Sequence, residues 1–193
     1  MENIILKRFK ESSEVKTRFL KENLPRLLDL IKLIARTFEA GNKIFFFGNG
    51  GSAADAQHLA AEFVNRYVMD RPPLPAIALT TDTSILTSVS NDLSFIEIFS
   101  KQIRALGREG DVAIGISTSG NSANVTKAFE VAKEMGMKTV ALTGNDGGAL
   151  AKIADISLVV SSTSTPRIQE AHILIGHILC EMVEHQLFFK VNP

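Results

Sequence analysis

Apolar residues near the start of the chain recur at helical spacing. The pattern predicts two helices, over residues 3–22 and 25–40, each with an apolar stripe. Pro25 suits the first turn of the second helix, where its missing N–H does no harm, and Gly41 ends that helix. We therefore expect the chain to open with a helical arm.

A different pattern covers the rest of the chain, where short apolar runs alternate with helical stretches. The runs are predicted strands at 43–47, 76–79, 111–117, 138–143 and 156–160. The predicted helices lie at 52–69, 84–90, 95–106, 123–135 and 166–189. Continuously apolar strands separated by helices are typical of a parallel sheet covered on both faces. The prediction is one domain: a helical arm (1–41) and a three-layer, flavodoxin-like, doubly wound α/β core (42–193) with a five-stranded parallel sheet.

Composition and charge exclude several classes of function. The 193 residues include 21 Lys+Arg and 21 Asp+Glu, so no overall charge points to nucleic acid or to an anionic membrane. No apolar run approaches the ~18 residues of a membrane span, and the charged N-terminus lacks a signal-peptide core. The single cysteine, Cys180, excludes an intrachain disulfide and a cysteine-based zinc cluster. We expect a soluble, cytoplasmic protein with no nucleic-acid or membrane partner.

The segments that follow the apolar runs are small and rich in glycine or hydroxyl groups. They are GNGGS (48–52), TTDTS (80–84), STSGNS (117–122), TGNDGG (143–148) and SSTSTP (161–166). Ligands of open α/β sheets bind beyond the carboxyl ends of the strands. These segments are therefore the predicted ligand site.

Two of these segments suit a phosphate group. GNGGS precedes a predicted helix, whose N-terminal N–H groups favour anions, although a tight strand-to-helix turn explains it equally well. It lacks the GxGxxG spacing and an acidic ribose anchor, so no nucleotide cofactor is predicted. In STSGNS, hydroxyls crowd before another helix at Ser117, Thr118, Ser119 and Ser122. Helix capping explains one of these hydroxyls, so we favour phosphate binding.

Histidines supply the candidate acid–base and metal chemistry. His58 and Glu62 lie four residues apart on one helical face, where they can bind a metal, exchange protons or form an ordinary surface pair. His177 lies among apolar residues and is expected to be at least partly buried, a position that a merely structural histidine also occupies. For His172 and His185 we expect structural roles alone.

Spacing along the last helix bears on assembly. Gln169 and His177 are eight residues apart, roughly 12 Å along an α-helix, so they share one ligand set only if another element fills the gap. The apolar stripes of the N-terminal helices also exceed the needs of one core, and such stripes often bury against a partner. We therefore expect an obligate homo-oligomer whose sites draw on more than one chain, with Glu62 and His177 from different chains.

Together, these motifs resemble the phosphoheptose isomerases of the sugar-isomerase (SIS) superfamily. The resemblance rests on GNGGSAADAQH with Glu62, SND (90–92), GISTSGNSANV (115–125), LTGNDGG (142–148) and RIQEAHILIGHILCE (167–181). It implies a homotetramer with sites between subunits. It also implies conversion of sedoheptulose 7-phosphate to D-glycero-D-manno-heptose 7-phosphate, the entry step to the heptose of bacterial lipopolysaccharide.

The resemblance further implies roles for individual residues. Substrate contacts fall on Asn49, Gly50, Gly51, Glu62, Asn91, Asp92, Ser117, Thr118, Ser119, Ser122 and Gln169. One zinc ion per subunit falls on His58, Glu62, Gln169 and His177, and the acid–base pair is Glu62 and His177. Some members have an aspartate where this chain has Pro166, so no role is carried to that position.

Two alternatives belong to other functional classes. A non-catalytic tetramer of the same superfamily binds the replication initiator protein, and RPPLPAIAL and LFF resemble it, but that paralogue lacks the equivalents of Glu62 and His177. A sugar-phosphate-sensing regulator normally adds a DNA-binding helix-turn-helix domain, for which this chain is too short. The isomerase is therefore the predicted function.

Overall fold

A parallel sheet of five strands lies at the centre of the fold, with the strand order β2-β1-β3-β4-β5. The computed structural model describes residues 1–189, so the last four residues of the predicted core lie outside it. The strands are β1 (Ile44–Gly48), β2 (Ala76–Ala78), β3 (Val112–Ser117), β4 (Lys138–Gly144) and β5 (Ile156–Val160). All four strand pairings are parallel. The predicted fold class is confirmed.

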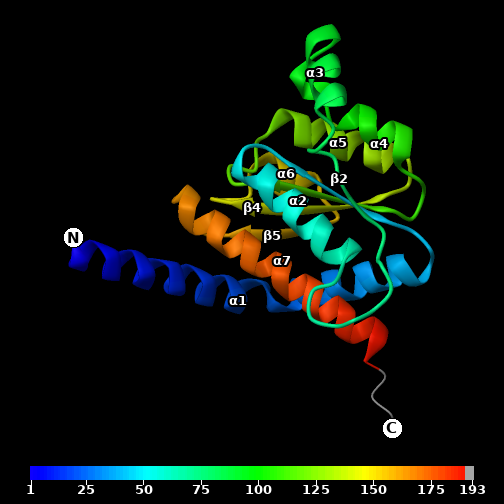
Figure 1. Ribbon diagram of the computed structural model, residues 1–193. Helices are drawn as coiled ribbons and strands as arrows, with labels where there is room; N and C mark the ends of the chain where they lie inside the picture. Colours follow the sequence, from blue (N-terminus) through cyan, green and yellow to red (C-terminus); the bar gives the residue numbers. More distant parts are fainter. Residues whose placement is uncertain (190–193) are drawn as a thin grey trace.

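Helices cover both faces of the sheet (Figure 1). One layer consists of α1 (Glu2–Glu39), α2 (Gly51–Val64) and α7 (Thr165–Phe188). On the other face lie η1 (Phe95–Glu97), α4 (Ser100–Leu106), α5 (Ala123–Glu134) and α6 (Gly148–Ile153), with α3 (Thr83–Asp92) standing beyond them. Because side chains alternate along a strand, Phe45 and Phe47 pack in one layer, and Ile44 and Phe46 in the other.

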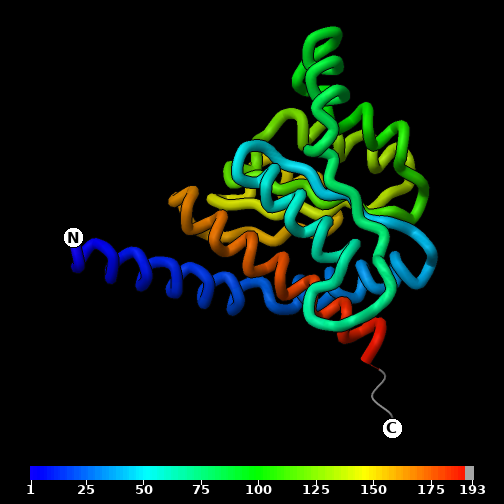
Figure 2. Tube along the Cα trace, in the orientation of Figure 1, coloured from blue at the N-terminus to red at the C-terminus, as the bar shows by residue number. Residues whose placement is uncertain are grey.

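The two predicted N-terminal helices are one continuous helix, which corrects the sequence analysis. α1 runs through Pro25 although a proline inside a helix typically costs ~3 kcal/mol. Phe19 on one side of Pro25, and Leu27 and Leu30 on the other, are all buried in the same core cluster. This packing against α7 and β5 holds both halves of α1 on the core. The N-terminal half of α1 projects beyond the sheet (Figure 2).

Other element boundaries differ from the prediction for local reasons. The helix predicted to reach residue 69 ends at Val64, and an irregular loop, 65–75, follows. The stretch 95–106 divides into η1 and α4, and the short helix α6 was not predicted because its six residues are too few to show helical periodicity. None of the helices within residues 1–189 is long and apolar enough to span a membrane.

Candidate active site

Two imidazoles meet where α2 packs on α7. His58 Nε2 lies 2.9 Å from His177 Nε2, and the two rings stand edge to face at 68°. One turn along α2, Glu62 Oε1 lies 3.5 Å from His58 Nε2. A hydrogen bond between two imidazole nitrogens requires one ring to donate and the other to accept. The cluster therefore places a carboxylate and a second imidazole on either side of His58, on a partly exposed surface.

This cluster corrects the expectation that Glu62 and His177 come from different chains. Both residues belong to a cluster centred on His58 within a single chain, and His177 is half-buried as predicted. Gly176 makes the close packing possible, because a Cβ at that position would overlap the side chain of Leu59 on α2. The two catalytic candidates thus need no partner subunit to come together.

Gln169 does not join the cluster. The side chain of Gln169, on α7, packs against the first turn of α2. A Cβ atom built on Gly51 would lie 2.5 Å from the Nε2 atom of Gln169. His177 meets His58 two turns further along both helices, so the predicted separation of roughly 12 Å is preserved. Gln169 is therefore placed to contact a ligand at the N-terminus of α2 rather than at the histidine pair.

The donor set fits zinc only in part. Two imidazole nitrogens and one carboxylate oxygen, from His58, His177 and Glu62, are of the types that zinc prefers. However, no group of three or more His, Cys, Asp or Glu side chains within residues 1–189 is arranged to hold a metal ion. Since Gln169 lies apart, this arrangement of one chain does not bring the four expected ligands together.

Asp55 is a member of this neighbourhood that the sequence analysis missed. Burial raises the pKa of its carboxyl group, although the nearby His58 and His177 act in the opposite direction. Its buried Oδ2 atom has no hydrogen-bond partner among the described residues. The available signal was its position three residues before His58, which places both side chains on one face of α2.

The hydroxyl-rich turn after β3 forms a second part of the site. Ser117 Oγ lies 2.8 Å from Ser122 Oγ and 3.4 Å from Ser119 Oγ. Ser122 occupies the N-cap position of α5, yet its side chain makes no capping hydrogen bond. Capping therefore does not account for this hydroxyl. Three hydroxyls beside the free N–H groups of a helix start make a neutral cradle for an anion.

A reciprocal amide pair ties the loop after β1 to this turn. The side-chain amides of Asn49 and Asn124 each donate to the other at 2.9 Å. Asn124 is buried, and the sequence analysis did not single it out. Next to Asn49, Gly50 has φ 58°, a conformation that glycine adopts without strain. The pair fixes the loop that leads into α2 against the loop that leads into α5.

Further strand-end segments meet beside Ser119, as predicted. A hollow of about 810 Å³ is lined by Arg18, Ser119, Asn121, Asn145, Asp146, Ser161, Ser162 and Thr163. Asn145 Nδ2 also donates to the backbone oxygen of Thr118 at 3.0 Å, which joins the loops after β3 and β4. The loops after β3, β4 and β5 therefore form one polar surface.

Asn91 and Asp92 are not brought to this surface by their own chain. Both are exposed at the end of α3, a helix that contains no buried residue and stands away from the body of the fold (Figure 1). Their side chains hydrogen-bond to each other at 2.8 Å. The structure thus leaves two of the expected substrate contacts facing outward.

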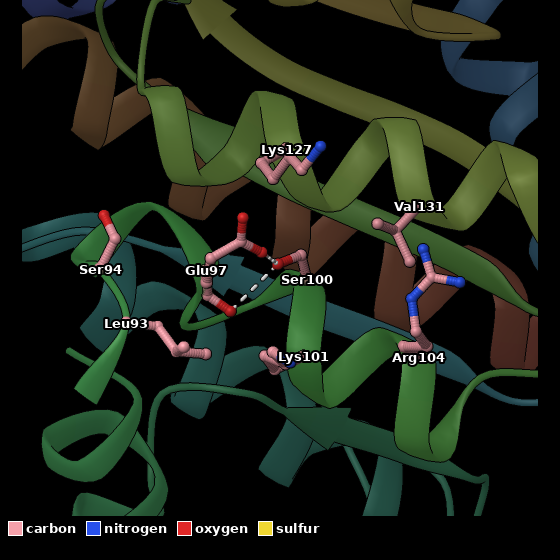
Figure 3. Close-up of a pocket in the computed structure, with 8 residues that line it drawn as sticks. All are labelled: Leu93, Ser94, Glu97, Ser100, Lys101, Arg104, Lys127 and Val131. Carbon is pink, nitrogen blue, oxygen red and sulfur yellow. Dashed lines mark hydrogen bonds between the residues drawn. The ribbon is translucent and has the colours of Figure 1, made fainter. Parts of the chain in front are cut away.

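A separate pocket of about 460 Å³ lies between α4 and α5 (Figure 3). It is lined by Leu93, Ser94, Glu97, Ser100, Lys101, Arg104, Lys127 and Val131. Ser100 is hydrogen-bonded to Glu97, and Arg104 and Lys127 form ion pairs with Glu134 and Glu130. The pocket contains none of the predicted site residues and lies outside the candidate active site.

The remaining histidines lie outside the cluster. His172 is buried, its Nε2 lies 3.0 Å from the backbone oxygen of Thr143, and burial lowers the pKa of its imidazole to about 4. It is therefore neutral at neutral pH. His185 is exposed and stacks on Phe189.

Comparison with known proteins identifies the family. The SIS domain model matches residues 8–144. A phosphoheptose isomerase of Nitratidesulfovibrio vulgaris (strain Miyazaki F) is 52% identical over 188 residues, which cover 97% of this chain and 90% of that protein. The phosphoheptose isomerase of Thermodesulfovibrio yellowstonii is 53% identical over 188 residues, covering 97% and 94%. This chain belongs to the phosphoheptose isomerase family.

Solved structures of phosphoheptose isomerases have the same fold. The protein from Neisseria gonorrhoeae superposes with a TM-score of 0.90 at 45% identity, covering 95% of this chain and 98% of that chain. The protein from Francisella tularensis gives 0.91 at 40% identity, covering 95% and 97%. The predicted isomerase activity is confirmed at the level of the family. Nothing in these comparisons favours the initiator-binding alternative.

Proposed function

We propose that this chain converts sedoheptulose 7-phosphate to D-glycero-D-manno-heptose 7-phosphate by proton transfer through an enediol. The observation that carries this proposal is the cluster of Glu62, His58 and His177 on α2 and α7. The hydroxyl-rich turn after β3 also supports the proposal, because it offers a cradle for a phosphate group. Strand β3 is paired with β1, the strand that leads into α2, so the cradle and the first turn of α2 lie at the same edge of the sheet. The name shared by the relatives supports a phosphorylated heptose as the substrate. The cytoplasmic location and the role in lipopolysaccharide synthesis stay predictions.

The proposed reaction needs one base and one acid. The Glu62 carboxylate removes a proton from carbon 1 of the ketose, while the His177 imidazolium protonates the carbonyl oxygen on carbon 2. The protonated Glu62 carboxyl group then donates a proton to carbon 2 of the enediol, and His177 takes the proton of the hydroxyl on carbon 1. The contact between the Nε2 atoms of His58 and His177 orients the His177 ring.

Replacing Ser122 with alanine is expected to raise KM for the phosphorylated sugar severalfold and to change kcat little. The Ser122 hydroxyl makes no capping bond and lies against Ser117, so its loss weakens binding in the ground state and transition state alike. Steady-state kinetics test this, with Thr126→Ala, one turn along α5, as the control. An unchanged KM together with a lower Tm would show that Ser122 stabilises α5 and does not bind the substrate.

We include zinc in the proposal because His58, His177 and Glu62 offer donor atoms of the types that zinc binds. The predicted fourth ligand, Gln169, lies apart from these three residues within one chain. When bound, zinc would act as a Lewis acid toward the sugar oxygens. Elemental analysis of the purified protein should find one zinc per subunit, and His58→Gln should lower that content, whereas His185→Gln should not. A zinc content near zero, or one that His58→Gln leaves unchanged, contradicts this part of the proposal.

We include a homotetramer with sites between subunits in the proposal. Two features support it: an exposed apolar face on the projecting half of α1, formed by Ile4, Ile5, Leu6 and Phe9, and the outward position of Asn91 and Asp92. In such an assembly, α3 of one subunit can supply Asp92 to the site of a neighbour.

Subunit mixing tests this arrangement. Inactive Asp92→Ala and inactive Glu62→Gln proteins should recover partial activity in hybrid oligomers, because some sites then contain both native residues. Glu62→Gln mixed with His177→Gln should stay inactive, since both residues belong to one cluster in one chain. A fully active monomer in sedimentation equilibrium, or no recovery with Asp92→Ala, contradicts the shared site.

A further inference from the structure

Tyr67 packs against the imidazole of His177. The two rings are stacked, with centroids 5.4 Å apart and an angle of 27° between their planes. His58 meets the same imidazole at its edge, through the nitrogen contact of 2.9 Å. His177 is therefore held by two aromatic neighbours, one on its face and one at its edge.

The loop that carries Tyr67 has no regular structure and is fixed by one carboxylate. Glu184, buried on α7, accepts hydrogen bonds from the backbone N–H groups of Tyr67 (2.8 Å), Val68 (3.0 Å) and Met69 (3.1 Å). Three consecutive N–H groups bound to one buried acceptor leave this part of the loop little freedom. Glu184 lies two turns beyond His177 on the same helix, so loop and imidazole share one support.

Arg71 connects this support to α2. Its Nε atom donates to Glu184 at 2.8 Å, and its other nitrogens donate to the backbone oxygens of Phe63 (2.7 Å) and Glu62 (3.0 Å). Carbonyl groups at a helix C-terminus lack partners within the helix, and Arg71 supplies them. The buried pair Arg71–Glu184 thus joins the end of α2, the Tyr67 loop and α7.

We propose that Tyr67 is a positioning residue for His177, with its ring face setting the orientation of the imidazole. The inference rests on the proposed acid–base role of His177. Proton transfer depends on the placement of the acid, and a misplacement of about 1 Å can cost ~10²-fold in rate. The stacked ring restricts rotation of the imidazole away from His58, and the Arg71–Glu184 pair holds the tyrosine backbone. Tyr67 itself exchanges no proton in this account.

Two substitutions at the half-buried Tyr67 distinguish the contribution of its ring from that of its hydroxyl group. Tyr67→Leu should lower kcat about tenfold and leave KM within about twofold, because the loss is one of orientation rather than substrate binding. Tyr67→Phe keeps the ring and should retain kcat within about twofold. Val68→Ala, at the exposed neighbouring position of the same loop, is the control and should behave as the wild type.

A spectroscopic readout accompanies the kinetics. The ring face of Tyr67 shifts the imidazole ¹H–¹³C resonances of His177, so Tyr67→Leu should move these signals and Tyr67→Phe should leave them close to their native positions. Wild-type kcat in folded Tyr67→Leu, an equal loss in Tyr67→Phe, or a rise in KM without a change in kcat would each overturn the inference.

His177→Gln in the same assay separates the two proposals. If His177→Gln is inactive while Tyr67→Leu is fully active, only the positioning role fails. If His177→Gln turns over normally, the acid–base assignment itself is wrong and the positioning role falls with it.

Discussion

Glu62→Gln and His177→Gln should each lower kcat by at least ~10², with the chain still folded. Glutamine keeps the approximate shape of both side chains but removes the basic carboxylate in one variant and the acidic imidazole in the other. Both positions are partly exposed, so the fold should tolerate the changes. Steady-state kinetics measure the effect, and thermal unfolding verifies the fold.

Matched substitutions elsewhere on the surface provide the control. Glu130→Gln on α5 and His185→Gln on α7 make the same chemical changes at positions outside the cluster. Both should keep wild-type turnover. Near-normal kcat in either Glu62→Gln or His177→Gln would remove that residue from the reaction.

The second large effect concerns stability. Glu184→Ala should lower the free energy of unfolding by about 3–5 kcal/mol, because it leaves the buried Arg71 guanidinium without its charged partner. It also removes the acceptor for the three backbone N–H groups of the Tyr67 loop. Urea denaturation measures the loss through a lower midpoint at an unchanged slope.

An exposed ion pair provides a comparison for the stability loss expected from Glu184→Ala. Arg104→Ala breaks the surface pair with Glu134, in which both side chains are more than half exposed, and should cost less than about 1 kcal/mol. Glu184→Gln, which retains an oxygen acceptor, should lie between Glu184→Ala and the wild type. A loss from Glu184→Ala as small as that from Arg104→Ala would show that the buried pair does not support the fold.

The sheet was predictable because each of its strands is indicated by the residues of that strand alone. Each buried strand is a short, continuously apolar run between small residues, so the predicted strands match the observed ones to within about two residues. The failure at Pro25 has the opposite cause. A proline favours a helix start in local terms, but the burial of Phe19, Leu27 and Leu30 in one core cluster is a property of the folded chain.

The site was predictable where residue type alone carries the chemistry. The hydroxyls of Ser117, Ser119 and Ser122 were predicted to cluster, and they do. Asp55 and Tyr67 were missed because their significance arises from the contact between α2, α7 and the intervening loop. That contact depends on Gly176, whose missing side chain admits Leu59, and nothing in the local pattern around a single glycine in an apolar helix indicates it.

The most direct test of the account uses the purified chain and sedoheptulose 7-phosphate in deuterated water. D-glycero-D-manno-heptose 7-phosphate should appear with solvent deuterium at carbon 2, because the protonated Glu62 carboxyl group exchanges its proton with solvent while the enediol is bound. The aldose should not accumulate with Glu62→Gln under the same conditions. Folded wild-type protein that forms no aldose from this ketose would contradict the central claim.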